Sequence, residues 1–159
     1  MSQRAVIDGL QFARGAETLK GTLSSSQLPR LTGTQCATDG LTYELRGRTD
    51  SEGRCWLHIA VQGVLTLSCQ RCLGPIEFPL MLDSELLLTL SESEIDAAED
   101  DIDRVLAGKS MRVSELVEDE TILALPMAPM HEQCGQSQDD AKSGRNSPFA
   151  ALAKLKRVR

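Results

Sequence analysis

The segment WLHIAVQGVLTLS-CQRCLGP-IEFPLMLDSELLLT, residues 56–89, carries the strongest structural pattern in this sequence. On either side of its central turn, at residues 69–75, apolar side chains recur at every second position, which is the period of a strand with one buried face. The alternating apolar residues are Leu57, Ile59, Val61, Leu65 and Leu67 before the turn, and Ile76, Phe78, Leu80, Leu82, Leu86, Leu88 and Leu90 after it. Because the turn holds glycine and proline, we expect an antiparallel hairpin with Cys69 and Cys72 at its tip.

Two shorter segments before this hairpin also predict strands. Residues 31–37 form the first, which ends at the turn signal Asp39-Gly40, and residues 41–48 alternate as the second before a turn at 50–53. Strands that follow one another through short turns form an antiparallel meander. The sequence therefore predicts a meander of about four strands.

Helices are predicted on both sides of the strands. Residues 8–20 carry apolar side chains at helical spacing after the N-cap candidate Asp8, and residues 114–125 lie between the cap candidate Ser114 and the helix-stopping Pro126. One face of the meander needs apolar cover, and these helices can supply it. The predicted fold class is α+β, an antiparallel β-meander covered by flanking helices.

Three regions are expected along the chain. Residues 1–134 form a single α+β domain, with the hairpin tip at 69–75. Residues 135–147 are polar and without periodicity, which predicts a flexible linker. Residues 148–159 follow the helix-start signal of Ser147 and Pro148 and predict a short basic C-terminal helix.

Composition narrows the classes of function. The chain has 159 residues, 41% of them hydrophobic, and no apolar run long enough for a membrane span. No secretion signal is visible, so we expect a cytoplasmic protein in which the five cysteines are reduced or bind metal. The net charge of −6 excludes a polycationic RNA coat, and 3% aromatic residues argue against a sheet that stacks bases.

With these pieces in place, the sequence resembles the YceD family of small bacterial proteins with plastid relatives. Three blocks carry the resemblance: the CQRC turn at 69–72, the run LVEDE…LALP at 116–126 with Pro129, His131, Glu132 and Cys134 after it, and SPFA at 147–150 with Leu152 and LKR at 155–157. The resemblance implies a role in the synthesis, processing or stability of large-subunit (23S) ribosomal RNA. It implies no established catalytic activity, so it supplies a pathway and leaves the mechanism open.

The four residues Cys69, Cys72, His131 and Cys134 form a candidate metal site. The CxxC turn offers two thiolates and the HxxC segment offers two more ligands at the same spacing, a donor set suited to one structural zinc ion. The alternative is that the cysteines are ordinary reduced thiols. A redox pair or a cysteine nucleophile is less well supported, because a strand rather than a helix follows the CxxC turn and no orienting partner is visible. The remaining cysteines, Cys36 and Cys55, are predicted core or turn residues.

Two charged groups are candidate contact sites. The basic residues of the tail, with Arg71 at the hairpin tip, predict a phosphate-binding stripe, although basic residues also suit a helix C-terminus without any ligand. The tail residues concerned are Lys154, Lys156, Arg157 and Arg159. The run Glu118-Asp119-Glu120 cannot converge on one ion from a helix, so a solvated or partner-binding face is predicted there.

Three functions follow from these features. The first is a non-enzymatic factor that binds a precursor of the large ribosomal subunit through its 23S RNA. The second is an acidic adaptor or chaperone for a large-subunit ribosomal protein. The third, a processing enzyme, has no catalytic constellation in this sequence to support it.

Overall fold

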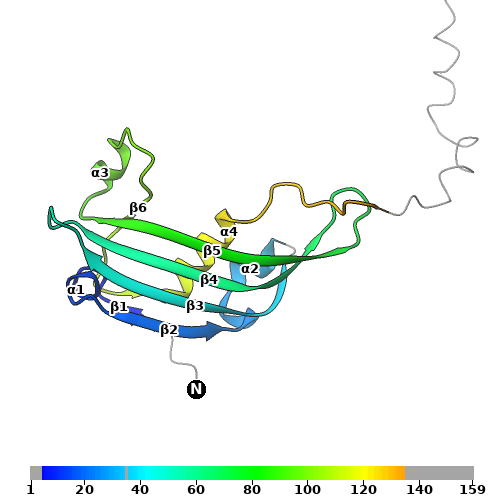
Figure 1. Cartoon of the computed structure of the whole chain (residues 1–159), viewed down its shortest axis with the longest axis horizontal. Helices are drawn as coiled ribbons and strands as arrows, with labels where there is room; N and C mark the ends of the chain where they lie inside the picture. The colour runs from blue at the N-terminus through cyan, green and yellow to red at the C-terminus, as the bar shows by residue number, and fades with distance from the viewer. Residues whose placement is uncertain (1–4, 35, 135–159) are drawn as a thin grey trace, which may run out of the picture.

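The computed structural model describes residues 5–34 and 36–134 of the chain. A five-stranded sheet in the order β2-β3-β4-β5-β6 forms the body of the molecule, and a two-stranded sheet pairs β1 with β7 (Figure 1). The strands are β1 (Val6–Ile7), β2 (Thr18–Leu23), β3 (Ala37–Thr49), β4 (Cys55–Ser68), β5 (Pro75–Thr89), β6 (Arg104–Leu106) and β7 (Met111–Arg112). The helices are α1 (Gly9–Arg14), the 3₁₀ turn η1 (Ser25–Gln27), α2 (Pro29–Gly33), α3 (Glu92–Asp96) and α4 (Val113–Leu123).

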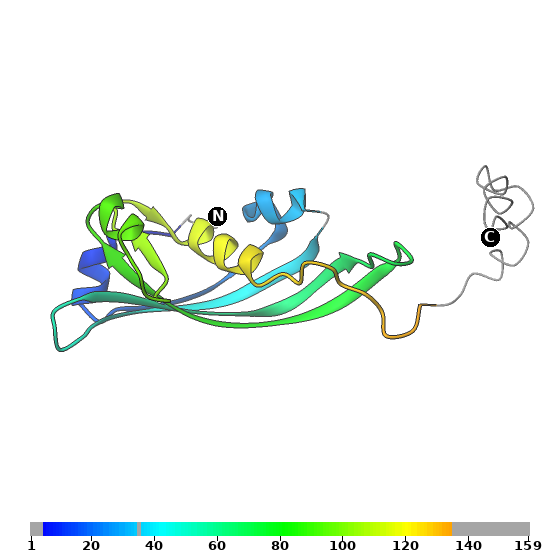
Figure 2. The same ribbon diagram turned by 90° about the horizontal axis from the view of Figure 1, so that it is seen from above.

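One face of the large sheet is covered and the other is open. The helices α1, α2 and α4 all lie on the same side of the sheet (Figure 2). The covered face holds the alternating apolar residues of the strands, among them Leu45, Leu57 and Ile59, which are fully buried together with Val117 of α4. The open face carries ion pairs such as Arg48–Glu85 and Lys20–Glu44. This division explains the period of two in the sequence, because successive side chains of a strand point to opposite faces.

The predicted hairpin is confirmed as the β4–β5 ribbon. Its pairing runs without interruption from Trp56 opposite Leu87 to Ser68 opposite Pro75. The far end of the ribbon extends past α2 and α4, so that the tip projects from the covered part of the sheet (Figure 2). Cys69 and Cys72 lie in the turn at the end of this projecting ribbon.

The expectation of a purely antiparallel meander of about four strands is wrong, although the α+β class is confirmed. The sheet is mixed, because the fifth strand β6 pairs in parallel with β5. After β5 the chain passes through α3 and returns, and the amide of Leu87 then donates to the carbonyl of Asp103 (2.9 Å) while Ala107 donates to Thr89 (2.8 Å). Parallel neighbours need such a crossover, and the three residues of β6 are too short to show a period.

The N-terminal helix predicted over residues 8–20 is only partly correct. Asp8 is the N-cap, and its Oδ1 accepts from the amide of Gln11 at 3.0 Å. The helix α1 ends at Arg14, however, and Ala16 has a left-handed backbone with φ of 48°. Beyond this turn the chain becomes β2, an edge strand of the large sheet, whose inward residues Leu19 and Leu23 also fit helical spacing. The two periods are indistinguishable over so short a segment.

The strand predicted over residues 31–37 is also wrong, because α2 occupies its first half. Proline at the first position of α2 starts a helix as readily as it limits one. The turn expected at Asp39-Gly40 is instead a bulge within β3, where the pairing with β4 shifts between Thr38 and Leu41.

The helix predicted over residues 114–125 is confirmed as α4, with one difference in its capping. Arg112, and not Ser114, takes the N-cap position, and no side chain caps the helix there. In the described parts of the chain, no helix has the length and apolar character of a membrane span. The expected linker at 135–147 and basic helix at 148–159 lie outside the described residues.

Candidate metal centre

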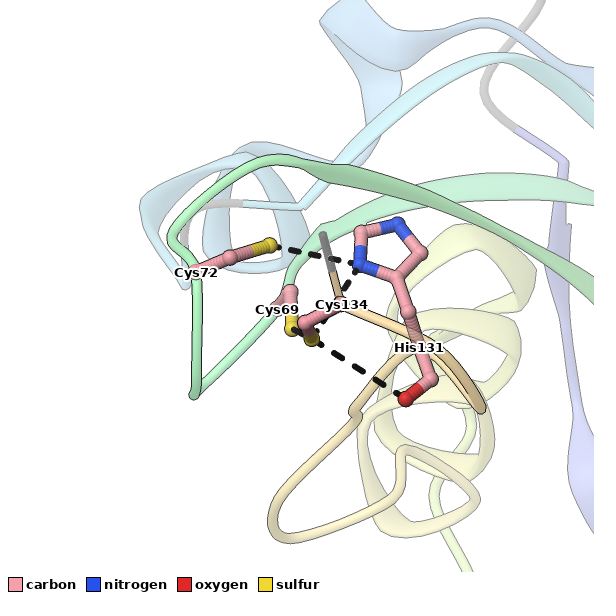
Figure 3. A group of neighbouring side chains, drawn as sticks. All are labelled: Cys69, Cys72, His131 and Cys134. Atoms are coloured by element: carbon pink, nitrogen blue, oxygen red, sulfur yellow. Dashed lines mark hydrogen bonds between the residues drawn. The ribbon is translucent and has the colours of Figure 1, made fainter. Parts of the chain in front are cut away.

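The hairpin tip is shaped by a tight backbone turn. The amide of Cys69 donates to the carbonyl of Gly74 (2.8 Å), and the amide of Leu73 donates back to Cys69 (2.9 Å). Leu73 takes a left-handed backbone conformation with φ of 60°, which closes the turn. As a result, the side chains of Cys69 and Cys72 lie on the same side of the tip (Figure 3).

A second segment, far along the sequence, completes the tip. After α4 the chain passes Pro126 and Pro129 without forming a helix or strand and reaches the end of the ribbon (Figure 1). It is attached there by two hydrogen bonds, from the amide of Gln70 to the carbonyl of Pro129 (2.8 Å) and between His131 Nε2 and the carbonyl of Pro75 (3.0 Å). These contacts bring His131 and Cys134 to the two cysteines of the turn.

The four donor atoms converge on one point (Figure 3). All of them lie within 4.8 Å of one another. Sγ of Cys69 is 3.5 Å from Sγ of Cys134, Sγ of Cys72 is 3.3 Å from Nδ1 of His131, and Sγ of Cys134 is 3.9 Å from the same nitrogen. Ligands around a tetrahedral zinc ion are separated by about 3.5–3.8 Å, as follows from zinc–sulfur and zinc–nitrogen distances of about 2.3 and 2.0 Å. The three contacts of 3.3–3.9 Å are therefore close to the ligand spacing of a tetrahedral site.

The orientation of His131 also suits a metal ligand. A carbonyl oxygen only accepts, so Nε2 must carry the hydrogen that it donates to Pro75. Nδ1, which faces the sulfur atoms, is then the nitrogen with a free lone pair. A ligating histidine commonly has its other ring nitrogen held by a backbone carbonyl in this way.

The electrostatics of the tip favour a thiolate at Cys69. Burial disfavours the charged form of this side chain, but the amides of Cys72, His131 and Arg71 and the thiol of Cys134 outweigh it and lower its pKa to about 5. The amide of Arg71 lies 3.4 Å from Sγ of Cys69. Burial, followed by the neighbouring sulfur atoms of Cys69 and Cys72, raises the pKa of Cys134. Adjacent thiolates repel one another, and a cation between them removes this cost.

The structure thus brings together all four residues that were predicted from their spacing. The spacing did not predict the carbonyl of Pro75, which orients His131. The other two cysteines lie elsewhere. They were predicted to be core or turn residues, and both are core residues, with Cys36 and Cys55 3% and 5% exposed. Arg71 is exposed at the tip, with its guanidinium 3.9 Å from the sulfur of Met130. The predicted tail residues Lys154, Lys156, Arg157 and Arg159 lie outside the described part of the chain.

The expectation of a solvated acidic face on α4 is wrong for two of its three residues. Glu118 is 2% exposed and accepts from the amides of Arg30 (2.7 Å) and Leu31 (3.0 Å), which are free donors at the start of α2. Glu120 is 9% exposed and accepts from the hydroxyl of Ser84 at 2.6 Å. Only Asp119 is half exposed, where it pairs with Arg30. These partners lie 36 to 88 positions away in the sequence, so no local pattern reveals them.

The fold and the tip define a class: a one-sided mixed sheet whose longest hairpin carries a cluster of three cysteines and one histidine. Comparison with known protein families gives a match over a part of the chain that includes all four residues of this cluster. The model of the family described as large ribosomal RNA subunit accumulation protein YceD matches residues 57–156, which is more than half of the chain. This protein therefore belongs to the YceD family. No solved structure matches the chain.

Proposed function

We propose that the protein is a cytoplasmic, non-enzymatic factor that binds a precursor of the large ribosomal subunit, with a structural zinc ion at its hairpin tip. The family description connects its members with the accumulation of large-subunit ribosomal RNA. The observation that carries the proposed mechanism is the donor set at the tip. Four protein ligands fill a tetrahedral shell, whereas a catalytic zinc site keeps one position for water or substrate.

Zinc is the proposed ion because of the ligand chemistry. Three sulfur atoms and an imidazole nitrogen are soft and borderline donors, which magnesium and calcium do not prefer. In the proposed site, the ion holds residues 129–134 against the β4–β5 turn. The tip then becomes a rigid surface at the end of a projecting ribbon.

The proposed RNA contact combines this tip with the basic tail. Arg71 is exposed beside Leu73, whose side chain is 78% exposed. Lys154, Lys156, Arg157 and Arg159 supply four further cations in the residues that follow the metal ligands in sequence. Guanidinium and ammonium groups bind phosphate oxygens, which provides affinity for RNA without sequence selection.

Ultraviolet crosslinking in growing cells tests this contact. The protein is purified under denaturing conditions and the attached RNA is sequenced. We expect reads from large-subunit precursor RNA, and fewer reads when Arg71 and the four tail cations are changed to glutamine. Lys109→Gln is the matched control, because Lys109 is exposed but lies in the loop between β6 and β7, away from the tip.

A second candidate function is an acidic adaptor for a basic ribosomal protein. The net charge of −6 favours it. In that case Asp119 is a proposed part of the partner surface, and the buried Glu118 and Glu120 are its neighbours on α4. Crosslinking without specific RNA, together with a basic ribosomal protein that co-purifies under native conditions, would replace the first proposal by the second.

A further inference from the structure

Among the described residues, no strand lies beside part of the β5 edge. β5 runs from Pro75 to Thr89, but β6 pairs only with its last three residues, Leu87 to Thr89. In an antiparallel pair, the backbone groups of successive residues point alternately toward the partner strand and away from it. The amide of Leu87 donates to Asp103 and the carbonyl of Thr89 accepts from Ala107, both on the side away from β4. The odd-numbered residues of β5 therefore direct their backbone groups outward.

The tip half of this edge is protected against further pairing. Pro75 and Pro79 are both odd-numbered and have no amide hydrogen, and the carbonyl of Pro75 already accepts from His131. Prolines on an edge strand are a usual protection against added strands. Beyond Pro79, the outward-facing positions of β5 are no longer occupied by proline. In the described residues, no hydrogen bond reaches the outward amides and carbonyls of Met81, Asp83 and Glu85.

A groove of 370 Å³ follows this unprotected part of the edge. Its walls come from β5, from the residue before β6 and from the end of α4, including Leu82, Asp83, Glu85, Asp103, Glu120 and Leu123. Four of these residues are carboxylates, and no lysine or arginine of the described part of the chain lines the groove. Asp83 is bonded to His58 (2.9 Å) and Glu85 to Arg48 (2.8 Å), while Asp103 has no ion pair within the described residues. The groove therefore keeps an excess of negative charge.

We propose that an extended peptide with alternating basic and apolar residues adds to the sheet beside β5, along Met81, Asp83 and Glu85. Its backbone would pair with the outward amides and carbonyls, the mode of recognition known as strand addition. Side chains on the open face of the sheet would meet Asp83 and Glu85. Side chains on the covered face would meet Leu82 and Leu123, the latter 80% exposed. The alternation of the strand thus selects basic residues on one side of the peptide and apolar residues on the other.

This inference goes beyond the RNA contact proposed above. Only the identity of the natural peptide rests on the proposed role in ribosome assembly. That source is a basic extended segment of a large-subunit ribosomal protein. A negative groove also speeds the encounter with a basic segment at low salt.

The probe is a fluorescein-labelled peptide of nine residues in which lysine and valine alternate, titrated with the full-length protein and followed by fluorescence anisotropy. Met81→Pro removes an outward amide but no bond to β4, and Pro79 shows that an odd position of this strand accepts proline. We expect binding to weaken about tenfold or more, as for the loss of a backbone hydrogen bond with added steric exclusion. Met81→Ala, which keeps the amide, and Glu77→Pro, which makes the same change outside the groove, are expected to bind as the wild type does.

Three further measurements keep the test decisive if Met81→Pro is poorly folded. Asp103→Lys is expected to weaken binding in the same assay, because it reverses a charge in the groove. Hydrogen exchange at the amides of Met81, Asp83 and Glu85 is expected to slow when the peptide is added. A peptide of the same composition with its lysines in one block is expected to bind more weakly than the alternating one.

Several results would overturn the proposal. Equal binding of the two peptides, or no loss in Met81→Pro and Asp103→Lys, would reduce the interaction to non-specific charge. A dimer that Met81→Pro converts to monomer would assign the edge to a second copy of the chain. Binding that requires neutralisation of Lys154, Lys156, Arg157 and Arg159 would assign it to the protein's own tail. None of these results bears on the crosslinking outcome, so the two proposals can fail separately.

Discussion

The two turns at the ends of β4 are built by different means. The β3–β4 turn is completed by one carboxylate and its immediate neighbours. Oδ1 of Asp50 accepts from the amides of Glu52 (3.0 Å) and Arg54 (2.9 Å), and Oδ2 accepts from the Arg54 guanidinium (2.8 Å) and the Trp56 indole (2.9 Å). The β4–β5 turn is completed by His131 and Cys134, which lie 59 and 65 positions from the cysteines they contact.

The difference indicates which of the two turns is suited to a bound ion. The oxygens of Asp50 have strong donors on every side, so the β3–β4 turn is satisfied by the protein alone. Thiols are weak donors and weak acceptors, and at the tip they face mainly one another and an imidazole nitrogen. Such a cluster gains little from its own hydrogen bonds but has the arrangement that a soft cation needs.

Removing two of the proposed ligands from the tip is expected to have the largest effect. The wild-type protein, purified without added metal, is expected to contain about one zinc ion per chain. In the Cys69→Ser/Cys72→Ser variant we expect zinc affinity to fall more than about a hundredfold. Loss of a group that only hydrogen-bonds to a ligand already lowers metal affinity about 10–100-fold, and here two ligands are lost. Metal analysis measures the content, and faster hydrogen exchange at the amide of Gln70, which is bonded to Pro129, reports release of the segment.

Cys55→Ala is the control for that experiment. Cys55 is buried at the start of β4 and lies outside the cluster, so this variant should retain its zinc. A fully folded wild-type protein that is free of zinc would contradict the proposed metal site.

The corresponding change at the other turn is Asp50→Ala. It removes four hydrogen bonds at once, and we expect Tm to fall by roughly 4–8 °C while zinc content is unchanged. Glu52→Ala is a matched control in the same turn. Its side chain makes only an exposed ion pair with Arg54, so Tm should change little. Calorimetry of the zinc-loaded proteins measures both, and equal effects of the two variants would contradict the role given to Asp50.

The two turns should respond differently to acid. The indole of Trp56, and then the guanidinium and amide of Arg54, hold the pKa of Asp50 below its ordinary value although partial burial opposes this. A lowered pKa in the folded state stabilises the protein above the ordinary pKa of the carboxyl, near 4, and this contribution is lost only as the pH falls further. Zinc ligands must be deprotonated, so protons are expected to displace the ion from the proposed site as the solution becomes acidic.

We therefore expect zinc release at a higher pH than the loss of the Asp50 contribution. The measurement is Tm of the wild type and of Asp50→Ala across the acid range, with free zinc followed in parallel by a chromogenic chelator. The difference in Tm between the two proteins should persist where zinc has already left. A difference that disappears together with the zinc would show that the two turns are not independent.

What could be predicted from the sequence follows the same contrast between local and distant contacts. The β4–β5 hairpin was predictable because its two strands are long, adjacent and alternate in step around one turn. The cluster of the four proposed metal ligands was predictable because the members of each pair lie three residues apart. Only the assumption that the two pairs meet in space had to be added. β2 and β6 were not, because six and three residues do not distinguish a strand from a helix or a loop.

The buried carboxylates of α4 show a second limit. Three consecutive acidic residues predict a solvated face, since burial of a carboxylate is costly without partners. Glu118 and Glu120 are buried because Arg30, Leu31 and Ser84 supply donors from other elements. These partners are set by how α2, α4 and β5 pack, and that packing has no local signature.

The smallest expected change in stability comes from the backbone conformations of the two turns. Leu73 at the tip and Gly53 in the β3–β4 turn both have a left-handed backbone, with φ of 60° and 79°. Such a conformation costs an L-residue about 1–2 kcal/mol, whereas glycine loses about 0.4–1 kcal/mol more conformational entropy on folding. Leu73→Gly should therefore stabilise the zinc-loaded protein by up to about 1 kcal/mol, and Gly53→Ala, which meets no atom within 4 Å, should destabilise it by a similar amount. Denaturant unfolding measures both. If Leu73→Gly is destabilising instead, the exposed leucine side chain contributes more to the tip than its backbone costs.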